Sequence, residues 1–194
     1  MLTAGIAMPA GAVITTVSDS GGVYAISLRV GAVTGVDTVA FSVTGVNAGL
    51  TPTAVTGTPT IDVSVTPIRP ANNSGTARPV TLKVDSSLGL PCQSGGCGTT
   101  IIPFNEISWT ATNNSASGTG DIQTGRFNGT TNQQIASFNA NATFCSFLII
   151  ILCLGYTYQS NAMDSTRLQF RYDNDVVYPA GNYKGTVRFT ASME

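Results

Sequence analysis

The sequence predicts an all-β chain folded as one antiparallel β-sandwich. Apolar residues recur at every second position in many short segments, which is the period of a half-buried strand. Gly, Pro, Asn and Ser separate these segments at short intervals, as turns do. No segment shows a sustained helical period with capping residues. Short strands with regular turns are typical of sandwiches, so we expect about eight to ten strands in an immunoglobulin-like arrangement.

The strands in the first half of the chain follow from this alternation. The even-numbered positions from Tyr24 to Val30 are all large and apolar. Val39 and Phe41 alternate with small or polar residues in the same way, and 45–59 is rich in Gly, Thr and Pro, which favours a long crossing loop. The predicted strands of this half are 12–18, where the alternation is weak, 23–30, 36–44, 61–65 and 80–84.

In the second half, a strand at 107–111 puts Trp109 on the same face as Ile107. Leu168, Phe170 and Tyr172 alternate in the next predicted strand. The predicted strands of this half are 107–111, 168–172 and 183–191. No strong linker interrupts the pattern, so we predict one sandwich domain over 19–194, preceded by an N-terminal extension over 1–18.

Composition excludes several functions. The chain has 9 basic and 10 acidic residues among 194, with 10% charged and no histidine. A net charge of −1 gives no surface that neutralises phosphates, so no nucleic-acid partner is expected. Without histidine there is no Ser-His-Asp machinery and no imidazole metal site. We therefore predict no enzyme, no catalytic residue, no cofactor and no metal, and the lack of about 20 consecutive apolar residues predicts no membrane span.

The four cysteines favour an oxidising compartment, where disulfides persist. Cys92 and Cys97 flank a short loop with two glycines that permits a sharp reversal, so a local disulfide is expected in preference to a zinc or redox site. Cys145 and Cys153 are predicted disulfide cysteines as well, but they can bond each other only if the chain between them doubles back. The alternative is a buried central strand over 146–152, with both cysteines paired elsewhere or free.

The doubled-back alternative would expose a run of large apolar residues that needs cover. Under it, Phe147, Ile149 and Ile151 are candidate contacts with a neighbouring subunit.

The N-terminal extension is a candidate donor strand for a second copy of the chain. Alternate apolar residues would lie on one of its faces, and we assign them to a subunit interface: Ile6, Met8, Ala10, Ala12 and Ile14. Two other interpretations stay open. The segment can be the first strand of the chain's own sheet, or its first residues can be the remnant of a signal peptide.

Two surface features allow a different function. Sequons, which are acceptor motifs for N-glycosylation, occur at Asn72, Asn113, Asn128 and Asn141. Aromatic residues offer either a sugar-stacking platform or ordinary core and cross-strand packing; they are Trp109, Tyr156, Tyr158, Tyr172, Tyr178 and Tyr183.

The C-terminal segment from Leu168 to Ser192 has the pattern strand, turn, strand. Its part Pro179-Ala180-Gly181-Asn182-Tyr183-Lys184-Gly185-Thr186-Val187-Arg188-Phe189 resembles the terminal strand of secreted bacterial fimbrial subunits. The similarity is greatest to the spore-coat-U and Csu-type pilins, and it covers about the last 25 residues of the chain.

The resemblance implies an incomplete sandwich that an N-terminal arm of the next subunit completes. It also implies a periplasmic chaperone and an outer-membrane usher as export partners. We therefore expect a structural subunit of an extracellular, cell-surface filament, a homopolymer with roles in adhesion or biofilm. The alternative is a secreted carbohydrate-binding or adhesive module that acts as a monomer.

Overall fold

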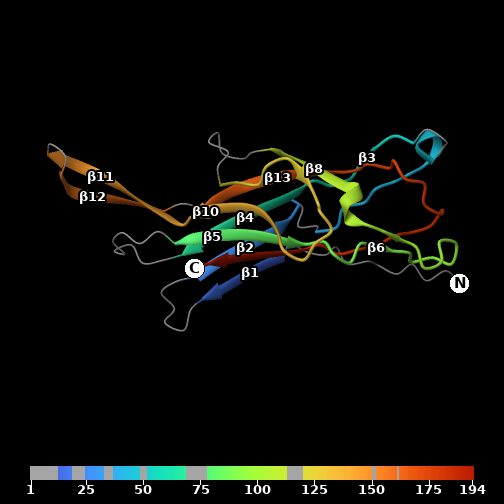
Figure 1. Cartoon of the computed structure of the whole chain (residues 1–194), viewed down its shortest axis with the longest axis horizontal. Helices are drawn as coiled ribbons and strands as arrows, with labels where there is room; N and C mark the ends of the chain where they lie inside the picture. Colours follow the sequence, from blue (N-terminus) through green and yellow to red (C-terminus); the bar gives the residue numbers. More distant parts are fainter. Residues whose placement is uncertain are drawn as a thin grey trace, which may run out of the picture.

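The computed structural model describes residues 13–18, 25–32, 37–48, 52–68, 78–112, 120–149, 152–160 and 162–194 (Figure 1). Within these ranges the chain consists of strands and loops, with two short 3-10 turns, η1 (Gly45–Ala48) and η2 (Phe104–Glu106). No helix in the described ranges has the length and apolar character that crossing a membrane requires.

The larger sheet forms one layer of the sandwich. Its strands pair antiparallel in the order β1-β2-β4-β13-β8-β9, and β3 pairs with β13 beside β4. The strands are β1 (Val13–Ser18), β2 (Ala25–Gly31), β4 (Ile61–Ile68), β13 (Met163–Tyr172), β8 (Ile107–Thr112), β9 (Gly125–Arg126) and β3 (Val55–Thr56).

The opposite layer is a three-stranded sheet in the order β10-β5-β14. It comprises β10 (Gln133–Asn139), β5 (Pro79–Asp85) and β14 (Arg188–Met193). A short pair, β6 (Leu90–Pro91) with β7 (Ile101–Ile102), lies near one end of the sandwich. At the opposite end a hairpin of β11 (Asn141–Ile149) and β12 (Leu152–Ser160) extends away from both layers (Figure 1).

The core lies between the two layers and follows the period of two in their central strands. Ile61, Val63 and Val65 of β4 are at most 3% exposed, whereas the intervening Asp62 and Ser64 are half-buried. At one end of the core the ring centroids of Trp109 and Phe127 lie 4.9 Å apart. The prediction of an all-β antiparallel sandwich is therefore confirmed.

The predicted strand at 36–44 is wrong. Val39 and Phe41 pack against the core, as their alternation predicts. Their backbone joins no ladder, however, and only Ala40 exchanges a pair of hydrogen bonds with Thr58, at 2.8 and 2.9 Å. Alternation reports which side chains face the core, but it does not report whether a neighbouring strand is present to pair with.

The predicted strand at 183–191 begins later than expected, at Arg188, with a single bridge between Tyr183 and Cys92 before it. The strand β10 was not predicted at all. It lacks apolar alternation, and its register shifts between Gln134 and Ala136, which disturbs the period of two.

Candidate functional site

The candidate functional site is an open border of the sandwich at β14. Phe189, Ala191 and Met193 alternate along β14 and pack against the core, but all three are only half-buried. Their neighbours on the adjacent strand β5 are Val80, Leu82 and Val84, which are at most 1% exposed. Burial therefore falls from the centre of the small sheet to its β14 border.

The larger sheet shows the same fall in burial on the same side. β14 faces β2 across the core, and the core-facing residues of β2, from Ile26 to Val30, are half-buried. Those of the next strand, β4, are almost fully buried. Two half-buried apolar rows thus face each other along one side of the sandwich.

The order of strands in the two sheets accounts for the lower burial on this side of the sandwich. In the larger sheet β1 continues beyond β2, whereas in the smaller sheet β14 is the last described strand. Within the described residues, β14 forms a ladder with β5 alone, so the other edge of this 6-residue strand offers its N–H and C=O groups.

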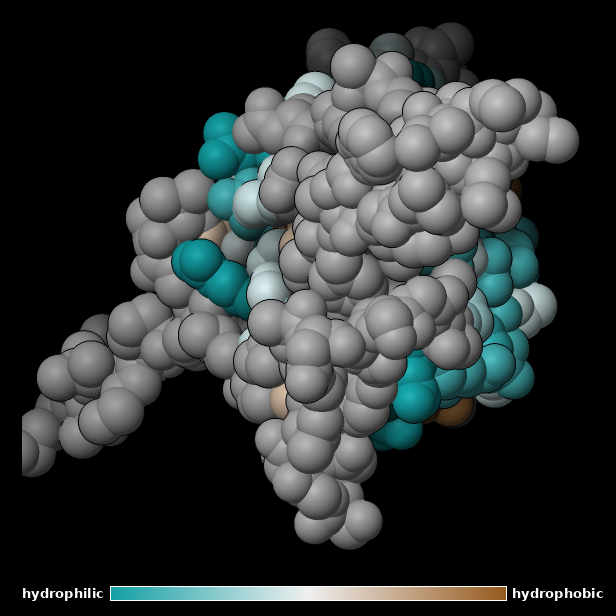
Figure 2. All heavy atoms as spheres, turned by 90° about the vertical axis from the view of Figure 1, so that its left-hand side faces the viewer, coloured by the Kyte–Doolittle hydropathy of each residue, from teal (hydrophilic) through white to brown (hydrophobic). Residues whose placement is uncertain are grey.

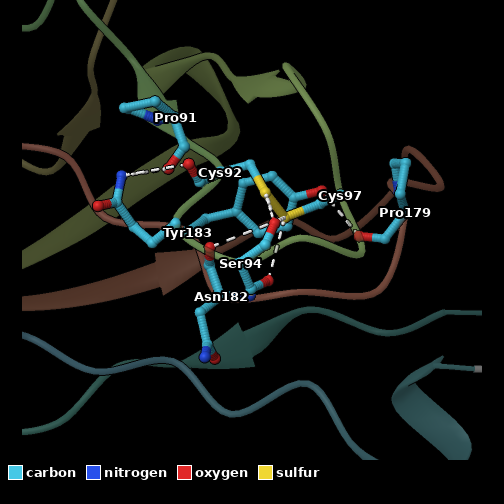
Figure 3. Close-up of a disulfide and its surroundings, with 8 residues drawn as sticks. Pro91, Cys92, Ser94, Cys97, Pro179, Asn182 and Tyr183 are labelled. Atoms are coloured by element: carbon cyan, nitrogen blue, oxygen red, sulfur yellow. Dashed lines mark hydrogen bonds between the residues drawn. A yellow bond between two sulfur atoms is a disulfide. The ribbon is translucent and has the colours of Figure 1, made fainter.

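A disulfide loop holds the segment that leads into β14. Cys92 and Cys97 are bonded, with their Cα atoms 5.7 Å apart (Figure 3). The backbone N–H of Gln93 donates to the carbonyl of Asn182 at 2.7 Å, and the N–H of Asn182 donates to Ser94 Oγ at 3.1 Å. The local disulfide predicted from the glycine-rich loop is confirmed, and its function here is to anchor the chain before β14.

Gly181 explains part of the motif that resembles fimbrial subunits. A Cβ added at Gly181 would lie 2.8 Å from Cys97 Cβ, so the segment can approach the disulfide this closely only with glycine. The hydroxyl of Tyr183 donates to the carbonyl of Pro179 at 2.7 Å and closes the turn around it (Figure 3). The Pro-Ala-Gly-Asn-Tyr sequence is thus a turn fitted to the disulfide loop.

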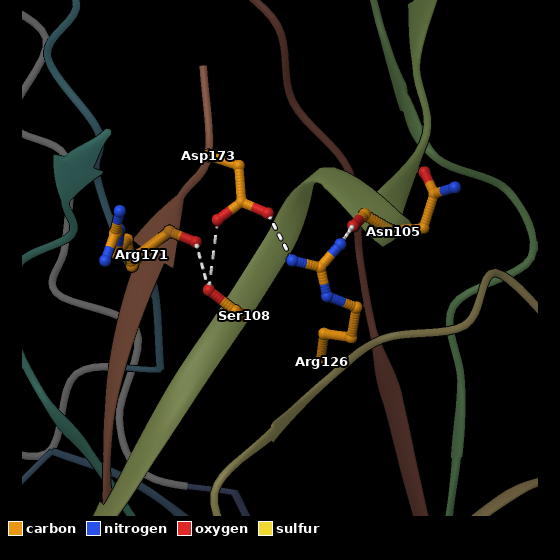
Figure 4. Close-up of polar contacts among 5 residues, drawn as sticks. All are labelled: Asn105, Ser108, Arg126, Arg171 and Asp173. Atoms are coloured by element: carbon orange, nitrogen blue, oxygen red, sulfur yellow. Dashed lines mark hydrogen bonds and ion pairs between the residues drawn. The ribbon is translucent and has the colours of Figure 1, made fainter. Parts of the chain in front are cut away.

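A second cluster of polar groups lies where β13 ends. Arg126 forms an ion pair with Asp173 at 2.6 Å, and Ser108 Oγ donates to the other oxygen of Asp173 at 3.3 Å (Figure 4). Asn174, at a φ of 55°, donates from Nδ2 to the carbonyls of Asn47 and Thr53 at 2.8 and 2.9 Å. The segment 173–175 therefore connects the end of β13 to neighbouring loops through the side chains of Asp173 and Asn174.

Glu106 is the strongly perturbed group of this cluster. Burial, followed by the hydrogen bond and charge of Asp175 and by the charge of Asp173, raises the pKa of Glu106 to about 7, against the opposing charge of Arg126. Burial and the nearby Glu106 also raise the pKa of Tyr172 to about 12. Glu106 therefore titrates near neutral pH, with the carboxyl group of Asp175, far away in the sequence, as a neighbour. Sequence analysis missed this group because nothing in the local pattern joins 106 to 175.

This pKa predicts a pH dependence of stability. The ordinary pKa of Glu106 is 4.5, so between about pH 4.5 and 7 the folded state binds more protons than the unfolded state. The free energy of unfolding should therefore fall as the pH rises through this window. In Glu106→Gln, which stays neutral, thermal unfolding should depend less on pH here, and the variant should be more stable than the wild type above pH 7.

The control is Glu194→Gln, which changes the only other glutamate of the chain, an exposed residue at its C-terminus. Its melting temperature should follow the wild-type pH profile. A Glu106→Gln profile identical to that of the wild type would contradict the raised pKa of Glu106.

The predicted interface residues fall into three groups. Ile14 lies in β1, which pairs with β2 of the same chain, so 13–18 of the predicted extension form a strand of the chain's own sheet. Ile6, Met8, Ala10, Ala12 and Ile151 lie outside the described residues. Phe147 and Ile149 lie in β11, near the end of the hairpin that is farthest from the sandwich.

The second pair of cysteines lies on the two strands of this hairpin. The chain doubles back between them, as the first alternative requires. In the register, however, Cys145 is opposite Tyr156, and Cys153 is opposite Leu148, three positions further along. The register shifts at two points between these pairs, and the assignment of Cys145 and Cys153 to a disulfide stays a prediction.

Of the predicted glycosylation sites, Asn128 lies in an exposed turn, where Oδ1 accepts hydrogen bonds from the N–H and hydroxyl of Thr130 at 3.0 and 2.7 Å. Asn141 begins β11, and Asn72 and Asn113 lie outside the described residues. Among the aromatic residues, Trp109 and Tyr172 are buried in the core and do not belong to any surface platform.

Comparison with known proteins gives no relative, because no protein-family model, no curated protein and no solved structure matches the chain. In the described ranges, His, Cys, Asp and Glu side chains form no group of three that could hold a metal ion.

Proposed function

We propose that this chain is a structural subunit that polymerises into an extracellular filament by accepting a strand beside β14. The observation that carries the proposal is the pair of half-buried rows on β14 and β2, at a border where β14 is the last described strand of the small sheet. A donated strand would extend the β14 ladder and insert alternate side chains between these rows.

The donor is the N-terminal segment 1–12 of the next copy. Residues 13–18 form β1, so the strand exchange rests on the preceding residues, where Ile6, Met8 and Ala10 recur at every second position. The C-terminal resemblance to fimbrial subunits supports this assignment. The same resemblance implies a periplasmic chaperone and an outer-membrane usher as export partners. The Cys92–Cys97 disulfide supports secretion to the cell surface, because disulfides persist in oxidising compartments.

Ala191→Asp tests the proposal, because it places a charge in the half-buried row of β14 where the donor side chains would insert. The wild-type chain should form fibres in negative-stain electron microscopy and high-mass species in light scattering, whereas the variant should stay monomeric or dimeric. Thr190→Asp adds the same charge to the exposed face of the same strand and should form fibres as the wild type does.

A synthetic peptide of residues 1–12 provides an independent test. Added in excess to the wild type, it should occupy the border of β14 and stop fibre growth. Strand donation would be overturned if the Ala191→Asp variant formed fibres as well as the wild type does, and if the peptide did not slow the growth of wild-type fibres. A wild-type chain that remains a monomer at all concentrations would instead favour a carbohydrate-binding or adhesive module.

A further inference from the structure

Uncharged side chains supply most of the polar groups of this chain. Only 10% of the residues are charged, yet the described residues visible at the end from which the hairpin extends are mostly hydrophilic (Figure 2). The chain has 13 asparagines, and asparagine is the amide side chain whose carbonyl carbon lies within reach of the next backbone nitrogen. Asparagine is for this reason a chemically labile residue.

Asn128 is the one asparagine of the sequence that is followed by a glycine. The backbone nitrogen of the following residue is the nucleophile that attacks an asparagine side chain, and glycine shields this nitrogen least because it has no Cβ. Asn128 is exposed in the turn between β9 and β10, where Gly129 has a φ of 72°. A Cβ added at Gly129 would meet no atom within 4 Å apart from its chain neighbours. Solvent can therefore reach the nitrogen.

The hydrogen bonds of this turn act on the atoms that would react. Oδ1 of Asn128 accepts hydrogen bonds from the N–H of Thr130 at 3.0 Å and from its hydroxyl at 2.7 Å. The N–H of Gly129 forms no hydrogen bond with any described residue. Two donors thus point at the oxygen that gains negative charge when the nitrogen attacks Cγ of Asn128, and the attacking N–H is free to lose its proton.

Contacts on both sides hold the turn in this arrangement. The N–H of Asn128 donates to Oε1 of Gln133 at 2.9 Å, and Nε2 of Gln133 donates to the carbonyl of Arg126 at 2.7 Å. The N–H of Ser86, next to β5, donates to the carbonyl of Thr130 at 3.0 Å. The two donors on Oδ1 are therefore positioned before any reaction begins, which lowers the entropic cost of reaching the transition state.

We propose that Asn128–Gly129 is a site of spontaneous covalent modification in the folded protein, where Asn128 becomes aspartate or isoaspartate through a succinimide. Hydroxide removes the proton of the Gly129 N–H, and this nitrogen forms a bond to Cγ of Asn128. The bond from Cγ to Nδ2 breaks, and Nδ2 takes a proton from water and leaves as ammonia. Nothing is oxidised or reduced in this step, and the hydroxide is regenerated.

Water then opens the succinimide ring at one of its two carbonyl carbons. Cleavage of the bond between the Gly129 nitrogen and Cγ gives aspartate. Cleavage of the bond between this nitrogen and the backbone carbonyl carbon of Asn128 gives isoaspartate, in which the main chain runs through Cβ and Cγ. Both products add one negative charge to a chain whose formal net charge is −1. This modification does not depend on the strand exchange at β14.

Incubation of the full-length wild type in mildly alkaline buffer made with ¹⁸O-labelled water tests the site. Peptide mapping by mass spectrometry should find the label at residue 128, and a protein-isoaspartate methyltransferase should methylate the aged chain there. Asn132 is the internal control, because it is exposed near the same turn but is followed by Gln133. The absence of label at residue 128, or equal labelling of Asn132, would overturn the proposal.

Thr130→Val tests whether the turn itself promotes the reaction. This variant removes the hydroxyl donor and keeps the backbone donor on Oδ1, so labelling of residue 128 should be slower by about two- to tenfold, the effect of losing one ordinary hydrogen bond. The matched control is Thr131→Val, because the Thr131 hydroxyl accepts a hydrogen bond from Asn132 instead, at 3.3 Å.

The rates should be compared at a temperature where circular dichroism shows that both variants are folded. Thr131→Val should then react at the wild-type rate. An unchanged or faster rate in Thr130→Val would overturn the proposed action of the Thr130 hydroxyl on Oδ1 of Asn128.

Discussion

Leu82→Ala should lower the free energy of unfolding by about 2–5 kcal/mol, which is a large fraction of the stability of a typical domain. Leu82 is fully buried in β5, the central strand of the small sheet, and pairs with Ala136 on one side and Ala191 on the other. The small neighbours leave a cavity that the surroundings cannot readily fill. Urea unfolding, with the midpoint and slope measured separately, checks the value.

Phe189→Ala on β14 is the variant to compare with Leu82→Ala, because its stability cost should depend on assembly. Phe189 is only half-buried, so its truncation should cost the isolated subunit less than Leu82→Ala does. If a donated strand covers Phe189 in the polymer, the cost should rise when the same variant is measured in fibres. Equal costs in monomer and fibre would show that the β14 border stays open after assembly.

Removing the disulfide with Cys92→Ser and Cys97→Ser should lower the free energy of unfolding by about 2 kcal/mol, because the short loop gains freedom in the unfolded chain. For a domain of this size, that corresponds to a decrease of about 4–8 °C in melting temperature. A reductant should lower the melting temperature of the wild type by a similar amount and leave the double variant unchanged.

The disulfide should also influence assembly, because its loop anchors the residues that lead into β14. The N–H of Lys184 donates to the carbonyl of Pro91 at 3.2 Å, next to the bridge between Tyr183 and Cys92. We expect the double variant to fold but to form fibres more slowly, since the start of β14 is less firmly held. Unchanged growth at a temperature where the variant is fully folded would limit the disulfide to a role in stability.

The local pattern of the sequence was sufficient for the fold class and for several strands. In β4, Ile61, Val63 and Val65 face the core because a strand alternates its side chains, and this period is visible in the sequence without any partner. The Cys92–Cys97 bond was predictable for the same reason, since a six-residue loop with two glycines closes on itself. These features depend only on residues that are close together in the chain.

The tertiary structure decided the features that depend on distant residues. Val39 and Phe41 alternate like a strand, yet no described strand pairs with their segment, and β10 forms without alternation because β5 provides its ladder. The pKa of Glu106 depends on burial and on Asp175, which the pairing of β8 with β13 brings near it. The half-buried rows lie on β14 and β2, at a side where β14 is the last described strand of its sheet, and only the packing of the two layers determines where that border lies.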